Sequence, residues 1–256
     1  MYSEIQTTGK RSGSVAPYSS ASAQPSQMRK TCDGSSLQDV MRLLRFEGSA
    51  TGACCTHTFR HRCVRSGQSV FTMGAAFDGL YVVRSGTLKS VVTHDDGSDH
   101  VIAFHMKGDL LGMDGVCKKQ YWCEALALTD CHVVCLPFEQ LFSPGRKCDD
   151  LEQVLYWAIS RQITREQLSY TVSPAARAEV RVARFLLQQS TCFANIGCSP
   201  RRFTLTMTRR DIGNYLSMSL ETVSRALSML HHHGMIEIAN REVTLLAPDA
   251  LRAFDG

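Results

Sequence analysis

The chain has no apolar run that approaches the roughly 18 to 20 residues of a membrane-spanning helix. Its first residues, MYSEIQTTGKRSG, lack the apolar core of a secretory signal. Both absences predict a cytoplasmic protein with no membrane partner. In that reducing compartment, its eleven cysteines are expected to be mostly thiols or metal ligands rather than disulfides.

A strong net charge is also missing. The formal charge of +4 would not by itself indicate a nucleic-acid partner. However, seven arginines fall between Arg177 and Arg210, so positive charge is concentrated in that part of the chain. With 256 residues, of which 44% are hydrophobic, the chain is long enough to bury two modest cores.

The residue pattern of the N-terminal part divides it into three successive segments. Residues 1–36 are rich in Ser, Gln, Thr and Gly and show no periodicity, which predicts a disordered tail. A short amphipathic helix is expected over residues 37–44. Residues 63–138 consist of short β-rich runs punctuated by glycines, which predicts an antiparallel barrel or jelly roll. We therefore assign residues 37–147 to a β-roll with a leading helix.

Residues 148–173 contain neither Pro nor Gly and predict one long helix. Its first turns carry an apolar row, Leu151, Leu155 and Ala158, that we expect to pack on the roll. A second row alternates spacings of three and four, which is typical of a coiled-coil seam and predicts a homodimer. The seam residues are Tyr156, Ile159, Ile163, Glu166 and Tyr170. The alternative is a single buried helix in a monomer, because the seam is short and Glu166 interrupts it.

Residues 205–235 predict two short helices joined by a tight turn. Thr208 can cap the first helix, with Asp211 three residues on, and Ser219 can cap the second. Ser217 and Met218 would form the turn. The apolar positions of the second helix recur at helical spacing and are expected to pack inward: Val223, Leu227 and Leu230.

Two strand-like runs, GMIEI and REVTLL, follow these helices and are joined by Ala239 and Asn240. Two helices followed by such a hairpin are typical of a winged helix-turn-helix, a DNA-binding motif. We assign residues 174–256 to this domain.

The outer face of the second predicted helix carries side chains suited to base edges in a major groove. The Glu221 carboxylate can accept from a cytosine amine, the Arg225 guanidinium can fork onto guanine, and the Ser224 hydroxyl can serve either kind of base. The alternative is a surface ion pair between Glu221 and Arg225, one helical turn apart. Further residues are expected to contact the DNA backbone or position the helices: Thr208, Arg209, Arg210, Ser219 and Thr222.

The run FTLTMTRRDIGNYLSMSLETVSR resembles the DNA-binding end of the fumarate and nitrate reduction regulators (FNR), a branch of the cyclic-AMP receptor protein (CRP) family. Upstream, VFTMGAAFDGLYVVRSGTLKS and VIAFHMKGDLLGMD resemble the sensory roll of the same regulators, so the resemblance spans residues 60–247. The fold expected is α+β: an N-terminal, cyclic-nucleotide-binding-like antiparallel β jelly roll, a long dimerisation helix and a C-terminal winged helix-turn-helix.

This resemblance implies a homodimeric transcription regulator that binds double-stranded DNA. Glu221, Ser224 and Arg225 match the family's base-reading E-x-x-S-R motif, and the half-site implied is TTGA-like. It also implies contact with RNA polymerase, and the turn at residues 94–97 is the expected contact site.

The signal sensed by the roll stays open. Members that bind cyclic AMP hold its phosphate with an Arg-Ser pair beside a short helix that begins Gly-Glu-Leu. Here Trp122 and Cys123 stand at the place of Arg-Ser, and Gly112, Met113 and Asp114 at the place of Gly-Glu-Leu. Because the phosphate would find no cationic partner, we do not expect cyclic AMP to bind.

The FNR branch implies an iron-sulfur cluster, which requires four converging thiolates. The branch places three cysteines in a C-x-x-C-x5-C-like run, a spacing that this chain does not reproduce. Val134 stands at the position of the internal ligand, and Cys135 is expected on the opposite strand face, sharing the face of Cys131 as an ordinary small hydrophobe. Candidate redox or cluster residues are Cys32, Cys54, Cys55, Cys63 and Cys135.

Four interpretations of the cofactor are therefore left. They are a cluster of unfamiliar spacing, haem, no cofactor, and reversible oxidation of the adjacent Cys54 and Cys55, whose basic neighbours favour thiolate. A solvated basic turn is the plain alternative for that segment.

Jelly rolls also house cupin-type metal-binding proteins and enzymes, which form the alternative functional class. Such a site needs closely spaced histidines, typically His-x-His with a downstream carboxylate. His100 and His105 lack that spacing, and their odd separation is expected to place them on opposite faces of a strand. We therefore expect no catalytic activity.

Overall fold

The computed structural model describes residues 34–47, 58–94, 96–138, 149–169 and 176–255. The tail expected over residues 1–36 falls outside this description up to residue 33. Ser35 and Ser36 form strand β1 (Ser35–Ser36), which pairs with β2 (Thr58–Phe59). The Ser36 hydroxyl accepts from the Asp39 amide at 3.2 Å and so caps α1 (Leu37–Leu44). The described fold therefore begins before residue 37.

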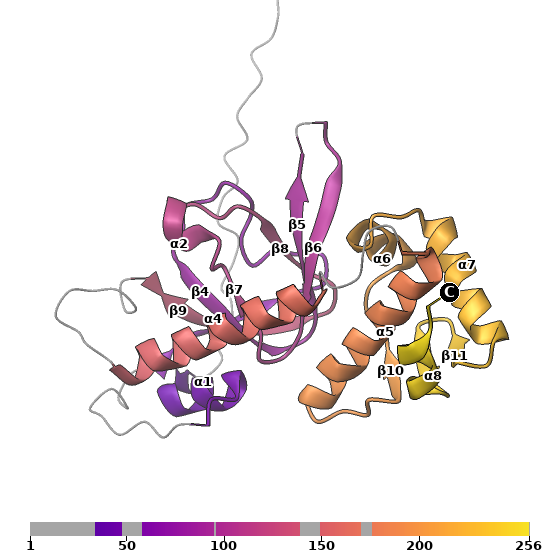
Figure 1. The fold of residues 1–256 in the computed structure, drawn as a ribbon. Coiled ribbons are helices and arrows are strands. Elements are labelled where there is room, and N and C mark those ends of the chain that lie inside the picture. The colour runs from indigo at the N-terminus through magenta and orange to yellow at the C-terminus, as the bar shows by residue number, and fades with distance from the viewer. Residues whose placement is uncertain (1–33, 48–57, 95, 139–148, 170–175, 256) are drawn as a thin grey trace, which may run out of the picture. The chain divides into compact units, whose positions relative to one another are not determined.

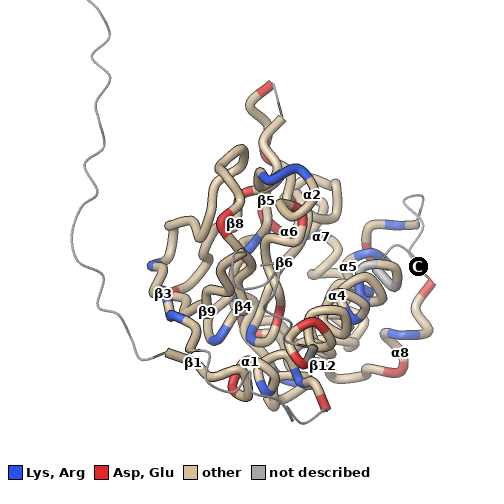
Figure 2. The backbone as a smooth tube through the Cα atoms, turned by 90° about the vertical axis from the view of Figure 1, so that its left-hand side faces the viewer, with Lys and Arg blue, Asp and Glu red and all other residues tan. Residues whose placement is uncertain are grey.

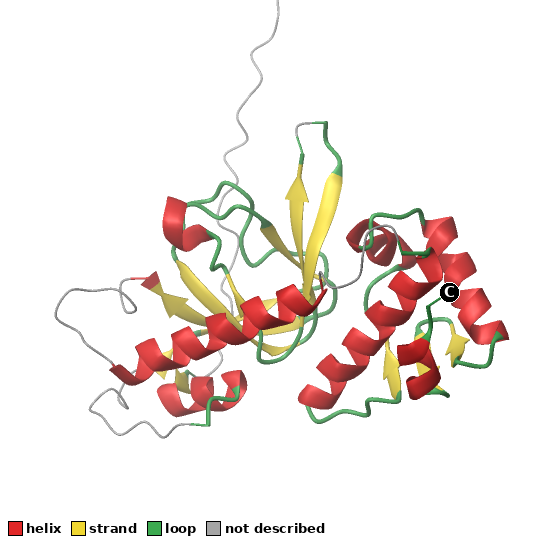
Figure 3. Cartoon of the chain, viewed as in Figure 1, coloured by secondary structure: helices red, strands yellow, loops and turns green. Residues whose placement is uncertain are grey.

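An antiparallel β-roll forms the N-terminal part of the described chain (Figures 1 and 3). One sheet has the strand order β3-β9-β4-β7 and the other β6-β5-β8, and all of these pairings are antiparallel. This confirms the predicted roll. The bounds are β3 (His61–Val64), β4 (Gly79–Ser85), β5 (Leu88–Thr93), β6 (Asp99–His105), β7 (Leu110–Leu111), α2 (Gly115–Lys118), β8 (Glu124–Ala127) and β9 (Cys131–Pro137).

Both faces of the β3-β9-β4-β7 sheet are buried. One face lines the interior of the roll, where Cys131 is buried and Cys135 packs alongside. The other face packs against α1 and α4, and Val134 is buried there. Cys131 and Cys135 thus share a face, as predicted, and Val134 points the opposite way. Cys135 cannot replace a ligand at position 134, because neighbouring strand residues point to opposite faces.

The expectation that His100 and His105 lie on opposite faces is wrong. In the β5–β6 pairing, Ser90 faces Ala103 while Val91 faces Val101, so Ile102 is an extra residue in β6. Such a bulge shifts the alternation by one residue. His100 and His105 therefore share a face of the ribbon. Among the described residues, no group of three or more His, Cys, Asp or Glu side chains is placed so that it could hold a metal ion.

His105 is 3% exposed, and its Nε2 lies 2.8 Å from Ser90 Oγ, while its Nδ1 has no hydrogen-bond partner among the described residues. Burial lowers the pKa of His105 from its usual 6.5 to about 4. The facing charges act in both directions, since Asp109 and Asp114 raise this pKa and Arg165 lowers it. His105 is therefore neutral in the folded state at pH 7.

This burial predicts a loss of stability in acid. As the pH falls from 6.5 to about 4, the unfolded chain binds a proton at residue 105 and the folded chain does not. The free energy of unfolding should therefore fall by about 3 kcal/mol over that window, at about 1.4 kcal/mol per pKa unit. Urea unfolding of wild type and His105→Gln from pH 7.5 to pH 4 measures this contribution.

The His105→Gln variant is expected to lose this part of the pH dependence, whereas His94→Gln, at an exposed position, serves as the matched control and should keep it. Equal slopes in wild type and His105→Gln would show that position 105 does not titrate as burial requires.

Helix α4 (Asp149–Ser169) presents two different faces. Leu151, Leu155 and Ala158 are buried against the roll, which confirms the predicted apolar row. On another face, Tyr156 is 69% exposed and Ile163 is 47% exposed, while Ile159 is partly buried. Of the other seam residues, the side chain of Glu166 and the whole of Tyr170 lie outside the described residues. None of the described helices has the length and apolarity to cross a membrane.

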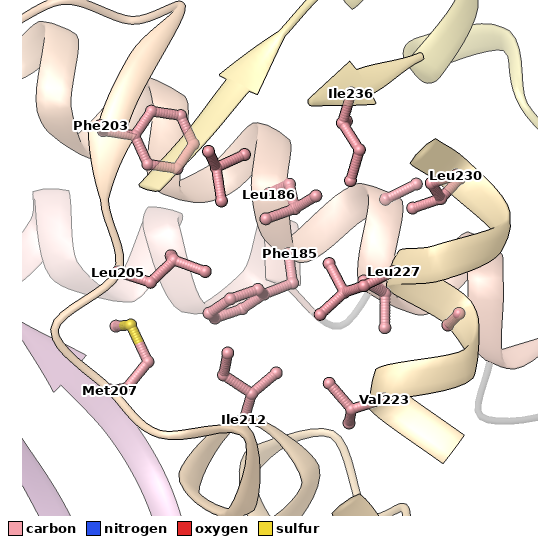
Figure 4. Packing of buried hydrophobic residues seen from close by; sticks show 14 of the residues in the cluster. Phe185, Leu186, Phe203, Leu205, Met207, Ile212, Val223, Leu227, Leu230 and Ile236 are labelled. Carbon is pink, nitrogen blue, oxygen red and sulfur yellow. The ribbon is translucent and has the colours of Figure 1, made fainter. Parts of the chain in front are cut away.

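The C-terminal domain combines helices with a three-stranded sheet of order β10-β12-β11. Figure 4 shows Phe185 and Leu186 of α5 meeting Ile212 of α6 and Leu227 of α7 in its core. The sequence pattern predicted only the last two of these strands. Their turn lies at Asn240 and Arg241 rather than at Ala239 and Asn240. The bounds are α5 (Ala178–Asn195), β10 (Arg202–Thr204), α6 (Arg209–Tyr215), α7 (Leu220–His232), β11 (Ile236–Ala239), β12 (Glu242–Leu245) and α8 (Pro248–Ala253).

Candidate DNA interface

Helix α7 separates a buried apolar face from an outer polar one. Val223, Leu227 and Leu230 are at most 3% exposed and belong to the C-terminal core, as their spacing predicted. The outer face is polar, with Glu221, Arg225 and Ser228 exposed and Ser224 half-buried. The helix is thus held by one face, and the other can meet a partner.

Local hydrogen bonds fix where α6 and α7 begin. Thr208 Oγ1 accepts from the Asp211 amide at 3.1 Å, and Asp211 Oδ2 accepts from the Thr208 amide at 2.9 Å. Both halves of a capping box are therefore present. Ser219 Oγ accepts from the Thr222 amide at 3.1 Å. The predicted caps are confirmed, while contact of Thr208, Ser219 or Thr222 with DNA stays a prediction.

The turn between α6 and α7 depends on Gly213, which was not among the residues predicted to form it. A Cβ at position 213 would lie 2.6 Å from the Met218 carbonyl oxygen. The Met218 amide donates to the Gly213 carbonyl at 2.8 Å, and Ser217 has a φ of +51°. The sequence does contain a signal for this role, namely a glycine inside a predicted helix. Glycine in a helix costs about 1 kcal/mol relative to alanine, so its presence there indicates a position where close packing excludes a Cβ.

Glu221 and Arg225 do not form the surface ion pair of the alternative interpretation. Among the described residues, the salt bridges involve other side chains. The pKa of Glu221 is lowered first by its own backbone amide and then by the Ser219 side chain, with Arg225 a smaller influence. The carboxylate is therefore ionised at pH 7, and within the described chain no hydrogen bond engages the Arg225 guanidinium.

The two arginines at the start of α6 have different surroundings. Arg209 Nη2 donates to the Asn240 carbonyl at 2.9 Å, which ties α6 to the turn of the β11–β12 hairpin. Burial, followed by the charge of Arg241, lowers the pKa of Arg209, but it stays protonated at pH 7. Arg210 is exposed. The structure therefore gives Arg209 a structural contact and leaves Arg210 the freer of the two to meet a phosphate.

This difference predicts distinct effects of two substitutions. Arg210→Ala should weaken binding to all DNA sequences alike and reduce the slope of log affinity against log salt by about 1. Arg209→Ala should also lower affinity for all sequences, but with a loss of about 1 kcal/mol in unfolding free energy, because it removes the bond to Asn240. Anisotropy titrations between 50 and 200 mM salt, with urea unfolding, separate the two. A base-selective loss in Arg210→Ala would contradict a phosphate contact.

The candidate cysteines do not converge in the described part of the chain. Cys63 is exposed on β3, and its Sγ lies 3.7 Å from His132 Nδ1. Cys135 lies on the opposite face of the sheet, toward the roll interior. Cys32, Cys54 and Cys55 fall outside the described residues. Cluster ligation or oxidation at these positions stays a prediction.

The place expected for a cyclic-nucleotide phosphate holds a carboxylate of the chain itself. Asp114 Oδ2 accepts from the Trp122 amide at 2.7 Å and from the Cys123 amide at 3.1 Å. These two amides are therefore engaged by an internal anion that would repel a phosphate. The residues present do not fit a cyclic nucleotide. Asp114 could not have been assigned this position from the sequence, because its partners are eight and nine residues away.

Two domain families match the chain. The Crp-like helix-turn-helix domain matches residues 180–254. The cyclic nucleotide-binding domain matches residues 61–143. Each match falls on the part of the structure that has the corresponding fold, the winged helix-turn-helix and the β-roll.

Among characterised proteins, the chain is 36% identical over 197 residues to the fumarate and nitrate reduction regulatory protein of Salmonella typhi, covering 77% of this chain and 79% of that protein. The protein of the same name from Escherichia coli gives the same identity and coverage. Among solved structures, FixK2 from Bradyrhizobium japonicum has a TM-score of 0.67 and 25% identity, covering 77% of this chain and 96% of that one. A CRP-family transcriptional regulator from Thermus thermophilus, at 23% identity and a TM-score of 0.60, covers 75% and 95% and supports the fold.

Proposed function

The chain belongs to the CRP/FNR family of transcription regulators, in its FNR-like branch, and we propose that it binds an inverted repeat of TTGA-type half-sites as a homodimer. The observation that carries this proposal is the outer face of α7. Glu221, Ser224 and Arg225 lie there on a helix whose other face is buried, within a Crp-like helix-turn-helix. A major groove admits such a helix.

Each base-reading residue has a chemical role in this proposal. Arg225 forks onto the guanine of the half-site, because a guanidinium presents paired donors that match two acceptors on that base. Glu221 accepts from the amine of the cytosine in the same or a neighbouring pair. Ser224 donates or accepts beside them. Phosphate oxygens are expected at the starts of the two helices, where Thr208 and Arg210 belong to the start of α6 and Ser219 and Thr222 to the start of α7.

Homodimerisation rests on the exposed face of α4. Tyr156 and Ile163 are seven residues apart, so they lie on one side of the helix, and both are large apolar side chains left open to solvent. Association of two α4 helices along this side would bury them. The resulting two-fold axis would present two α7 helices to the two halves of an inverted repeat.

The proposal is tested by titrating the wild-type protein against three duplexes: a TTGAT–ATCAA inverted repeat with a spacer of four base pairs, the same repeat with one half scrambled, and a fully scrambled duplex. We expect tight binding to the first, much weaker binding to the second and only salt-sensitive binding to the third. Equal affinity for all three would exclude sequence-specific reading.

For the signal, we infer a response to oxygen or redox state. Its support is the naming of the relatives as fumarate and nitrate reduction regulators, together with the adjacent Cys54 and Cys55 of this sequence. The sequence leaves four interpretations of this response: an iron-sulfur cluster, haem, reversible thiol oxidation and no cofactor at all.

If Cys54 and Cys55 carry the signal, exposure to air should change the DNA affinity of the wild type and have no effect when both are replaced by Ser. If a cluster does, protein purified without oxygen should show broad visible absorption and contain iron and sulfide in stoichiometric amounts. A sharp haem band would indicate the third interpretation. Colourless, iron-free protein with the same DNA affinity with and without oxygen would contradict all three.

The remaining parts of the proposal follow from the family. We infer contact with RNA polymerase through the turn at residues 94–97, whose described residues are exposed. A location in the cytoplasm follows from a DNA target. The relatives are transcription regulators, and we infer that this chain catalyses no reaction.

A further inference from the structure

A cavity of about 790 Å³ lies on the α1 side of the β3-β9-β4-β7 sheet, away from the interior of the roll. Its walls come from α1, from three adjacent strands and from the turn between β6 and β7. The lining residue His132 shows which face of the sheet the cavity lies on. Its neighbour Val133 faces the roll interior, and neighbouring strand residues point to opposite faces, so His132 points to the face that α1 covers. The charged and ionisable side chains that line it are Asp39, Arg42, His61, Arg84, Lys107 and His132.

Positive charge dominates this lining. Arg42, Arg84 and Lys107 are cations at pH 7, and Asp39 is the only carboxylate among the lining residues. Arg84 and Lys107 form no ion pair within the described part of the chain. Figure 2 shows Lys and Arg positions, coloured blue, beside α1, β3 and β4. Cations from separate elements are therefore brought to one cavity without matching carboxylates.

The single carboxylate has other partners. Asp39 Oδ2 accepts from the Ser36 amide at 3.0 Å and from the Ser36 hydroxyl at 2.8 Å, as part of the α1 cap. These bonds to Ser36 lower the pKa of Asp39 most, with Arg42 and Arg84 adding to the effect. Its salt bridge to Arg42 is long, at 3.5 Å, and both side chains are largely exposed. Asp39 therefore leaves the cavity with a net positive charge.

Arg84 is positioned by hydrogen bonds, one of which is to a buried serine. Its Nη1 lies 3.3 Å from Ser35 Oγ and 3.3 Å from His61 Nε2, and Ser35 Oγ lies 2.6 Å from the same His61 nitrogen. Ser35 is only 1% exposed, so one end of this group is anchored. A guanidinium has five N–H donors, and within the described chain only Nη1 of Arg84 has hydrogen-bond partners. The other donors are available to a ligand.

We propose that this cavity binds a small molecule bearing a phosphate or diphosphate group. Arg84 would supply a planar pair of donors and Lys107 a point charge, which is the usual combination for phosphate oxygens. The volume lies within the range of small-molecule sites and exceeds what an inorganic ion requires. The site is distinct from the DNA-reading face of α7 and does not depend on the function proposed above.

Isothermal titration calorimetry of the full chain with inorganic pyrophosphate, at constant ionic strength, tests the proposal. Arg84→Gln and Lys107→Gln should each weaken binding roughly tenfold or more, because each removes a charged hydrogen bond. Arg65→Gln and Lys118→Gln are matched controls, since both residues are exposed and neither lines the cavity. Both controls should bind as the wild type does, and thermal unfolding should show all four variants folded.

Three outcomes would overturn the proposal. One is the absence of binding by the folded wild-type chain. A second is equal affinity for pyrophosphate in wild type, Arg84→Gln and Lys107→Gln. The third is binding lost in Arg210→Ala but kept in Arg84→Gln, which would place the anion on the DNA-binding face instead.

Discussion

Replacing Arg225 with Ala is expected to weaken specific DNA binding by about 1 to 3 kcal/mol per half-site and to relax the preference at one G·C pair. The structure places Arg225 on the exposed face of α7, with no ion pair to Glu221 in the described chain to compete for its guanidinium. Truncation therefore removes a base contact and leaves the buried face of α7 unchanged. The measurement is a titration against the TTGAT–ATCAA repeat and each of its single-base variants.

Ser228→Ala is the matched control for this prediction. Ser228 is also exposed on α7, but one turn further along, and its replacement should leave the pattern of base preference as in the wild type. Comparison with Arg210→Ala separates specific from general effects, since loss of a phosphate contact lowers affinity for all sequences. If Arg225→Ala keeps the wild-type base preference, α7 does not read the groove as proposed.

Ile163→Glu is expected to dissociate the dimer and with it the two-site binding of the inverted repeat. Ile163 and Tyr156 form the exposed apolar side of α4, so a charge at position 163 would face its own copy across the seam. Burying two like charges there costs several kcal/mol. Sedimentation velocity over a range of concentrations measures the association, and the duplex with one intact half-site reports the remaining DNA binding.

Thr164→Glu supplies the matched control, since Thr164 is exposed on the same helix but points away from the seam by more than a quarter turn. It should leave the dimer intact. Glu166→Ala is expected to tighten association, because the seam predicted from the sequence brings two copies of Glu166 together. Dimers of Ile163→Glu as stable as those of the wild type would mean that another face of α4 forms the interface.

Patterns within four residues of each other were predictable from the sequence. Thr208 and Asp211 are three positions apart, and a capping box needs only that spacing and those side chains. Val223, Leu227 and Leu230 follow the helical repeat, so the buried face of α7 and hence its outer polar face could be assigned. The same holds for Cys131, Val134 and Cys135 on β9, because strand alternation alone separates their faces.

Contacts between distant segments were decided only by the tertiary structure. The extra residue Ile102 in β6 brings His100 and His105 to one face, and strand alternation taken alone gave the opposite result. Strand β10 precedes both DNA-binding helices in the sequence, yet it pairs with β12, which follows them. Arg209 finds its acceptor at Asn240 in the hairpin turn.

By itself, then, the sequence determined the family, the order of the domains and the polar face of the recognition helix, since these depend on short motifs and local periodicity. Tertiary structure decided that the Asp114 carboxylate accepts hydrogen bonds from the amides of Trp122 and Cys123, and that Arg84 and Lys107 line one cavity. The physical reason is that side-chain proximity across tens of residues depends on strand register and on how helices pack against sheets. Neither is encoded in the spacing of the residues that finally meet.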